Sequence, residues 1–78
     1  MSALAYEIRL RALREQAKRA TAHAAKLADH LQAKLDEGAD PAWYMVRELE
    51  RRHDVMITAL AEVAAAEAET ADAVGQDT

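Results

Sequence analysis

Apolar residues recur alternately four and three positions apart along two stretches of the chain. In the first stretch the repeat is Tyr6, Leu10, Leu13, Ala17, Ala20, Ala24, Leu27 and Leu31. In the second stretch it is Ala42, Val46, Leu49, His53, Met56, Leu60 and Val63. This heptad spacing is typical of helices that pack along one seam. The pattern therefore predicts an all-α protein made of two long amphipathic helices.

One turn signal separates the two stretches. The single interior glycine, Gly38, and the single proline, Pro41, lie close together. Gly38 suits the left-handed residue after a helix end, Asp40 suits an N-cap, and Pro41 suits the first helical position. We predict a single domain over residues 1–73, with helices over about 3–37 and 41–73 and a turn at 38–40. Residues 74–78 lack periodicity, and we expect them to fray.

Complementary sizes and charges favour an antiparallel, coiled-coil-like hairpin. If the turn centres near Ala39, residues whose numbers add to about 78 face each other, so that Ala24 meets His53 and Ala17 meets Leu60. Small residues then oppose large ones. Residues 1–34 carry seven Lys or Arg and three Asp or Glu, whereas residues 35–78 carry three and eleven, giving +4 and −8. The basic residues of helix 1 should therefore lie alongside the acidic residues near the end of helix 2: Glu62, Glu67, Glu69 and Asp72.

The second helix has a wider apolar stripe than one partner helix covers. A two-helix chain of 78 residues also buries little surface alone. We therefore predict a homodimer that forms a four-helix bundle, with a monomeric hairpin as the alternative. Candidate residues for the dimer interface or for contact with another protein lie at the edges of helix 2 and on an uncovered ridge of helix 1: Leu4, Ile8, Trp43, Tyr44, Met45, Met56 and Ile57.

Glu50 and His53 form a Glu-x-x-His pair, the spacing with which di-iron four-helix proteins direct a carboxylate and an imidazole at a metal. The facing part of helix 1 offers only Asp29 as a further carboxylate. We therefore predict no metal and no cofactor, and keep a metal-carboxylate protein with ligands Glu50, His53 and Asp29 as the alternative. In the preferred interpretation, His53 lies at a seam position, bonds to Glu50 or to a second subunit, sets the helix register and responds to pH.

Helix 1 also carries a basic stretch that suggests a third, nucleic-acid-binding interpretation. Glu7 and Glu15 dilute this stretch, and the net charge of the chain is −4, so a solvated, internally paired face is expected instead. The basic residues are Arg9, Arg11, Arg14, Lys18 and Arg19.

The remaining features narrow the class of function. The chain has no cysteine, no nucleophile motif and no glycine-rich phosphate loop. It also lacks an apolar run of the roughly 20 residues that a membrane span needs, and its first residues do not resemble a signal peptide. We expect a cytoplasmic, non-enzymatic interaction protein that acts as a small regulator, inhibitor or adaptor of another protein.

Overall fold

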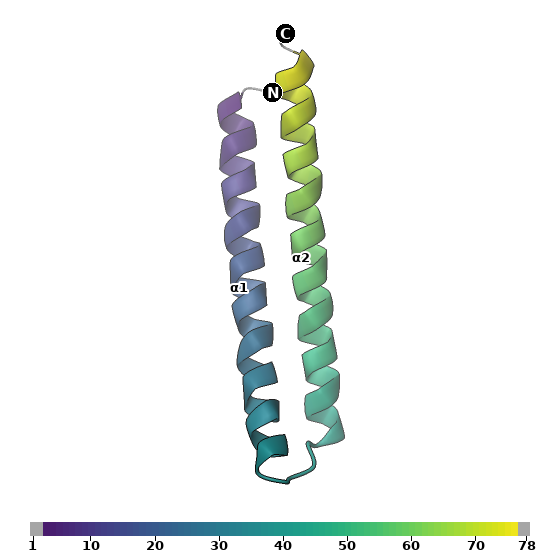
Figure 1. Ribbon diagram of the computed structural model, residues 1–78. Helices are drawn as coiled ribbons and strands as arrows, with labels where there is room; N and C mark the ends of the chain where they lie inside the picture. Colours follow the sequence, from purple (N-terminus) through teal and green to yellow (C-terminus); the bar gives the residue numbers. More distant parts are fainter. Residues whose placement is uncertain (1–2, 77–78) are drawn as a thin grey trace.

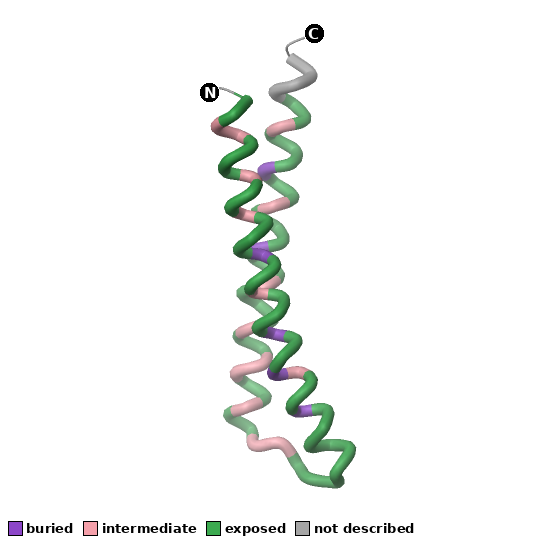
Figure 2. Tube along the Cα trace, turned by 90° about the vertical axis from the view of Figure 1, so that its left-hand side faces the viewer, coloured by how far each residue is buried: buried purple, intermediate pink, exposed green. Residues whose placement is uncertain are grey.

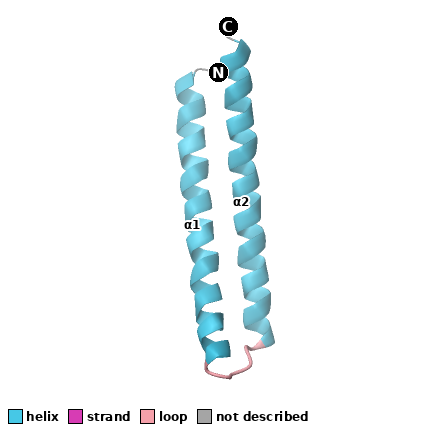
Figure 3. Ribbon diagram, in the orientation of Figure 1, coloured by secondary structure: helices cyan, strands magenta, loops and turns pink. Residues whose placement is uncertain are grey.

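Two helices run side by side in opposite directions in the computed structural model, which describes the backbone of residues 3–76 and the side chains of residues 3–72. Helix α1 spans Ala3–Asp36 and helix α2 spans Trp43–Gln76. The Cα atoms fill a rod of 59 × 16 × 14 Å, with the connecting loop at one end (Figure 1, Figure 3). The all-α antiparallel hairpin predicted from the heptads is confirmed.

The end of α1 matches the turn chemistry predicted for Gly38. Gly38 has a φ of 81°, in the left-handed region. Its N–H donates to the Leu35 carbonyl at 2.9 Å, and the Ala39 N–H donates to the Lys34 carbonyl at 3.0 Å. These two bonds form a Schellman motif, which satisfies carbonyls that the last helical turn leaves free.

Helix α2 begins later than predicted. The carbonyl of Ala42 accepts the first hydrogen bonds of the helix, from the N–H groups of Met45 at 2.9 Å and Val46 at 3.2 Å. Ala42, and not Asp40, is therefore the N-cap residue. Asp40 and Pro41 lie in the loop because the chain must cross the roughly 8–10 Å between two helix axes, and a residue before proline favours an extended backbone. The helix also continues to Gln76, where we expected fraying from residue 74; residues 77–78 lie outside the described part of the chain.

The core is thin and rich in alanine. Every residue of the predicted α1 repeat is buried or half-buried, which confirms that seam. Figure 2 shows these positions recurring along the rod. Because alanine has almost no side-chain volume, the helices are able to approach closely, but little apolar surface is covered. The buried residues are Ala17, Ala24, Leu27, Leu31, Ala59 and Ala66.

The residues of α2 that face α1 differ from the predicted repeat at alternate positions. Val46, His53 and Leu60 were predicted to face α1, yet all three are exposed. The stripe on α2 is wide enough to contain two neighbouring heptad repeats, and the small residues Ala59 and Ala66 allow a closer approach to α1 than Leu60 would. The residues that face α1 are Met45, Leu49, Arg52, Met56, Ala59, Val63, Ala66 and Thr70.

Ion pairs link the two helices where the charge distribution predicted them. Arg9 donates to Glu69 at 2.8 Å, and Arg14 donates to Glu67 at 3.2 Å. All four side chains are at least half exposed. Exposed pairs of this kind contribute between about 0 and 1 kcal/mol each, so they select the antiparallel direction more than they hold the helices together.

Candidate interaction surface

One long side of the hairpin exposes the apolar residues that the seam leaves out. Leu60 is 45% exposed, Ile57 49% and Val46 39%. Together with His53 these residues follow a second heptad repeat, one position beyond the inner one, and therefore share one side of α2. We call this side of the hairpin, with the part of α1 next to it, the lateral face.

Helix α1 contributes small side chains to the lateral face. Two adjoining grooves run along the boundary between the helices, and Thr21, Ala24 and Ala25 belong to one or both of them. The groove nearer the loop has a volume of about 500 Å³. Its lining combines a flat alanine surface on α1 with larger side chains on α2: Thr21, Ala24, Ala25, Ala28, Leu49, Glu50, His53, Asp54 and Met56.

Charged residues border the lateral face with opposite signs on the two helices. Arg14 and Lys18 lie at the α1 edge of the second groove. Glu50 and Asp54 lie at the α2 edge of the first groove, and Glu67 at the α2 edge of the second. An apolar strip with polar borders is the usual composition of a protein–protein interface.

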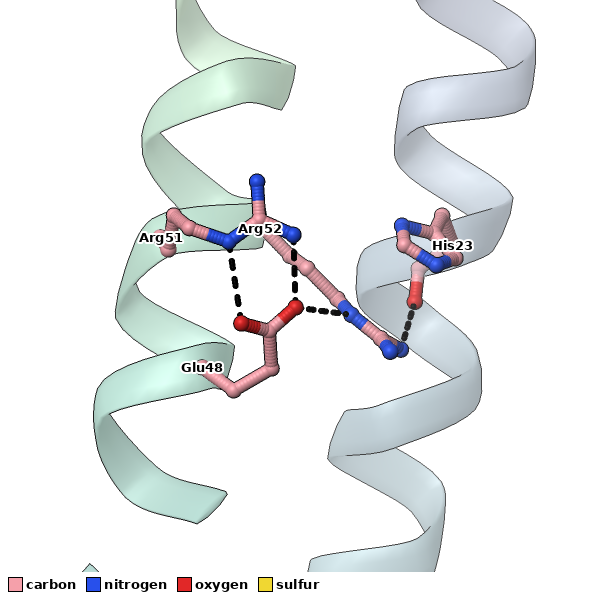
Figure 4. Close-up of polar contacts among 4 residues, drawn as sticks. All are labelled: His23, Glu48, Arg51 and Arg52. Carbon is pink, nitrogen blue, oxygen red and sulfur yellow. Dashed lines mark hydrogen bonds and ion pairs between the residues drawn. The ribbon is translucent and has the colours of Figure 1, made fainter. Parts of the chain in front are cut away.

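A charged cluster lies outside the two grooves (Figure 4). Glu48 Oε1 accepts from Arg51 Nη2 at 2.6 Å and from Arg52 Nε at 3.0 Å, and Glu48 Oε2 accepts from Arg51 Nε at 2.9 Å. The hydrogen bonds from Arg51 and then Arg52 lower the pKa of Glu48 to about 2. The same contact with Glu48 raises the pKa of Arg51. The cluster therefore stays ionised at any physiological pH.

Arg52 also connects the two helices. Its Nη1 donates to the backbone carbonyl of His23 in α1 at 3.1 Å, while Glu48 holds its Nε from the other side. The heptad pattern had placed His53 at this level of the seam, and Arg52 was missed. The signal that was available is Glu48 four residues before Arg52, a spacing that brings the two side chains together on one helix face.

The loop end of the rod carries an exposed aromatic pair. Trp43 is 71% exposed and Tyr44 63%. Their rings meet edge to face with centroids 6.2 Å apart, and the Arg47 guanidinium lies 5.9 Å from the centroid of the Trp43 ring. Such contacts hold the rings in a defined position on the surface.

The predicted ridge on α1 is exposed at the other end of the rod. Leu4 is 64% exposed and Ile8 62%. With Ala12 they line a shallow groove whose sides are charged, formed by Glu7, Arg11 and Glu15. This ridge lies on the side of α1 that faces away from α2, because residues 4, 8 and 12 are rotated by more than 120° from the seam.

The structure separates the predicted interface residues into two groups. Leu4, Ile8, Trp43, Tyr44 and Ile57 are exposed, as an interface candidate must be in the single chain. Met45 and Met56 are half-buried in the seam with α1; Met56 belongs to the predicted repeat, whereas Met45 had been placed beside it. Met56 nevertheless reaches the floor of the first groove.

Glu50 and His53 lie together on the lateral face, but Asp29 does not join them in the groove. Among the residues with described side chains, no group of three His, Cys, Asp or Glu is arranged to hold a metal ion. Among the described side chains, those of His53 and Glu50 form no hydrogen bond with each other. His53 is exposed and is not a seam residue of the hairpin.

The fold and this surface define a helical hairpin with one uncovered lateral face. Comparisons with known family models, with curated proteins and with solved structures find no match to this chain. Over the part of the chain that was described, neither helix combines the length and the apolar character needed to cross a bilayer.

Proposed function

We propose that this chain is a non-enzymatic protein-interaction module, a homodimer that acts as a small regulator, inhibitor or adaptor of another protein. The observation that carries the proposal is the uncovered lateral face, on which Val46, Ile57 and Leu60 remain 39–49% exposed. Two hairpins joined by this face form a four-helix bundle.

The exposed area supports a dimer. The chain exposes 5956 Å². A compact folded monomer of 8.6 kDa exposes about 4,700 Å², so the hairpin exposes about 1,300 Å² more than a compact protein of its mass. A standard protein interface covers about 800 Å² on each partner. Covering one long side of the rod therefore brings the exposed area into the range of an ordinary globular protein.

The side chains at the boundary of the grooves support the same arrangement. Leu49, Met56 and Val63 are half-buried in the hairpin, with one side against α1 and the other towards the grooves. A second hairpin on the lateral face covers their open side and turns a thin two-helix seam into a four-helix core. Because hydrophobic stabilisation follows the apolar area removed from water, this step stabilises each subunit as well as the dimer.

Two further exposed apolar surfaces are candidates for contact with another protein. One is the α1 ridge with Leu4 and Ile8, and the other is the aromatic pair Trp43 and Tyr44 at the loop end. Trp, Tyr and Arg are enriched among the residues that dominate interface energies, and Arg47 lies beside the Trp43 ring.

Sedimentation equilibrium at pH 7.5, with the metal content measured on the same sample, tests the proposal. A metal-free species of twice the 8.6 kDa chain mass is the expected result. A monomer at about 100 μM protein would contradict the dimer, since a specific interface of this size commonly binds with micromolar or better affinity. Stoichiometric iron, manganese or zinc would replace the proposal with the metal-carboxylate alternative.

A further inference from the structure

The proposed dimer has two possible symmetries, and the distribution of side chains on the lateral face distinguishes them. Building on the proposed function, we infer that the second copy packs with its twofold axis parallel to the helices. In this arrangement α1 lies against α2 of the partner subunit, and both loops lie at the same end of the bundle. The other arrangement has its axis across the helices, packs α1 on α1 and α2 on α2, and places the loops at opposite ends.

The level of each residue along the rod follows from the contacts between the helices. The residue numbers of the three cross-helix pairs add to 78 for Arg9 and Glu69, 81 for Arg14 and Glu67, and 75 for Arg52 and His23. Residues whose numbers add to about 78 therefore lie at one level. A twofold axis parallel to the rod preserves these levels in the dimer.

The sizes of the side chains favour packing α1 against α2. The α1 edge of the lateral face offers Thr21 and Ala25, whereas the α2 edge offers His53 and Ile57. With the axis parallel to the helices, Thr21 lies level with Ile57 of the partner subunit, and Ala25 lies level with His53 of the partner subunit. Small residues then receive large ones, as they do within each hairpin. The other symmetry packs α2 on α2 and sets the large apolar residues of this helix against one another.

Charge favours the same arrangement. Over its described length α1 has seven basic and four acidic residues, a net charge of +3, and α2 has three basic and seven acidic residues, a net charge of −4. On the border of the lateral face, Arg14 and Lys18 belong to α1, and Glu50, Asp54 and Glu67 belong to α2. Packing α1 on α2 sets a helix of net charge +3 against a helix of net charge −4 in both new helix pairs.

The alternative symmetry brings like charges together. Full overlap of the two rods places an axis across the helices at the middle of α1, near residues 19 and 20. Lys18 then lies beside Lys18 of the partner subunit, and the carboxylates of the two α2 helices face one another. Like charges that face each other at an interface repel, so they disfavour the dimer in which α1 packs on α1 and α2 on α2.

Distance measurement between nitroxide labels tests the orientation. The chain has no cysteine, so the Ala39→Cys and Thr58→Cys variants each carry one label site. Ala39 is exposed in the loop, and Thr58 is exposed near the middle of the rod, level with Ala20. Double electron–electron resonance measures the distance between the two labels in each full-length variant. Sedimentation equilibrium verifies the mass of the labelled protein, and circular dichroism verifies its helix content.

The expected result is a label distance below about 30 Å at both positions, since equivalent helices lie on the diagonal of the bundle, about 11–14 Å apart when neighbouring axes are about 8–10 Å apart. A distance near 50 Å at Ala39→Cys, with a short distance at Thr58→Cys, would overturn the orientation and leave the dimer intact, because a helix of 34 residues is about 51 Å long. A monomeric mass without dipolar coupling at either position would overturn the dimer itself, and with it this inference.

Discussion

Leu60 lies in the middle of the lateral face, where it tests the dimer with the least disturbance of the hairpin. It is 45% exposed in the single chain, so somewhat less than half of its surface is still available for burial. Fully burying a leucine contributes about 1.5–3 kcal/mol, so covering the remaining surface contributes about 1 kcal/mol per subunit. Because the proposed twofold dimer contains two copies of Leu60, we expect these residues to contribute about 2 kcal/mol to the interface.

The Leu60→Gln substitution removes this contribution and keeps a residue of similar helix propensity. A loss of about 2 kcal/mol corresponds to a dimer dissociation constant about 30-fold higher. The glutamine amide also loses hydrogen bonds to water when it enters the interface, so the 30-fold change is a lower limit. Sedimentation equilibrium at several protein concentrations measures the constant directly, and circular dichroism verifies that the helix content is unchanged.

Val55→Gln is the matched control. The exposed fraction of Val55, 48%, is similar to the 45% of Leu60. Val55 is five residues before Leu60, so it lies about 140° around the helix and outside the grooves. We expect its dimer dissociation constant to stay within about threefold of the wild-type value, since isolated surface substitutions usually change free energies by less than about 0.5 kcal/mol. An unchanged constant for Leu60→Gln, or an equal loss for Val55→Gln, would refute the assignment of the interface to the lateral face.

Two further predictions concern the core and the charged cluster. Leu31→Ala, at a site only 5% exposed, should reduce the free energy of unfolding in urea by about 2–4 kcal/mol, whereas Leu35→Ala, at a site 52% exposed, should reduce it by less than about 1 kcal/mol; equal losses would contradict the seam. Because its two arginine partners lower the pKa of Glu48 from 4.5 to about 2, the stabilisation that it provides is fully present above pH 4.5 and is lost as the pH falls towards 2. The difference in Tm between the wild type and Glu48→Gln should therefore vanish across that interval, and a difference independent of pH would argue against the cluster.

The hairpin was predictable because its determinants are local. A heptad repeat needs only the identity of residues three and four positions apart, and Gly38 marks the end of α1 through its own backbone preference. The opposite charges of the two halves gave the antiparallel pairing of Arg9 with Glu69 and Arg14 with Glu67. Each of these signals is readable without knowledge of the distance between the helices.

The place of each α2 side chain was not predictable in the same way. Met45 and Val46, Arg52 and His53, and Ala59 and Leu60 are neighbours in sequence, so a rotation of α2 by one residue, about 100°, exchanges which of each pair faces α1. Hydrophobicity alone favours the set with Val46 and Leu60. The observed set contains Arg52 at a half-buried position, which no hydrophobic pattern selects.

The sequence by itself therefore determined two helices, their turn and their antiparallel direction, because spacing, glycine and charge act over a few residues or over whole helices. The tertiary structure decided the rotation of α2, since this depends on how closely the alanines of the two helices approach and on the bonds that Arg52 makes to Glu48 and to the His23 carbonyl. That rotation exposes Leu60, Ile57 and His53 together, and it thereby creates the lateral face on which the proposed function rests.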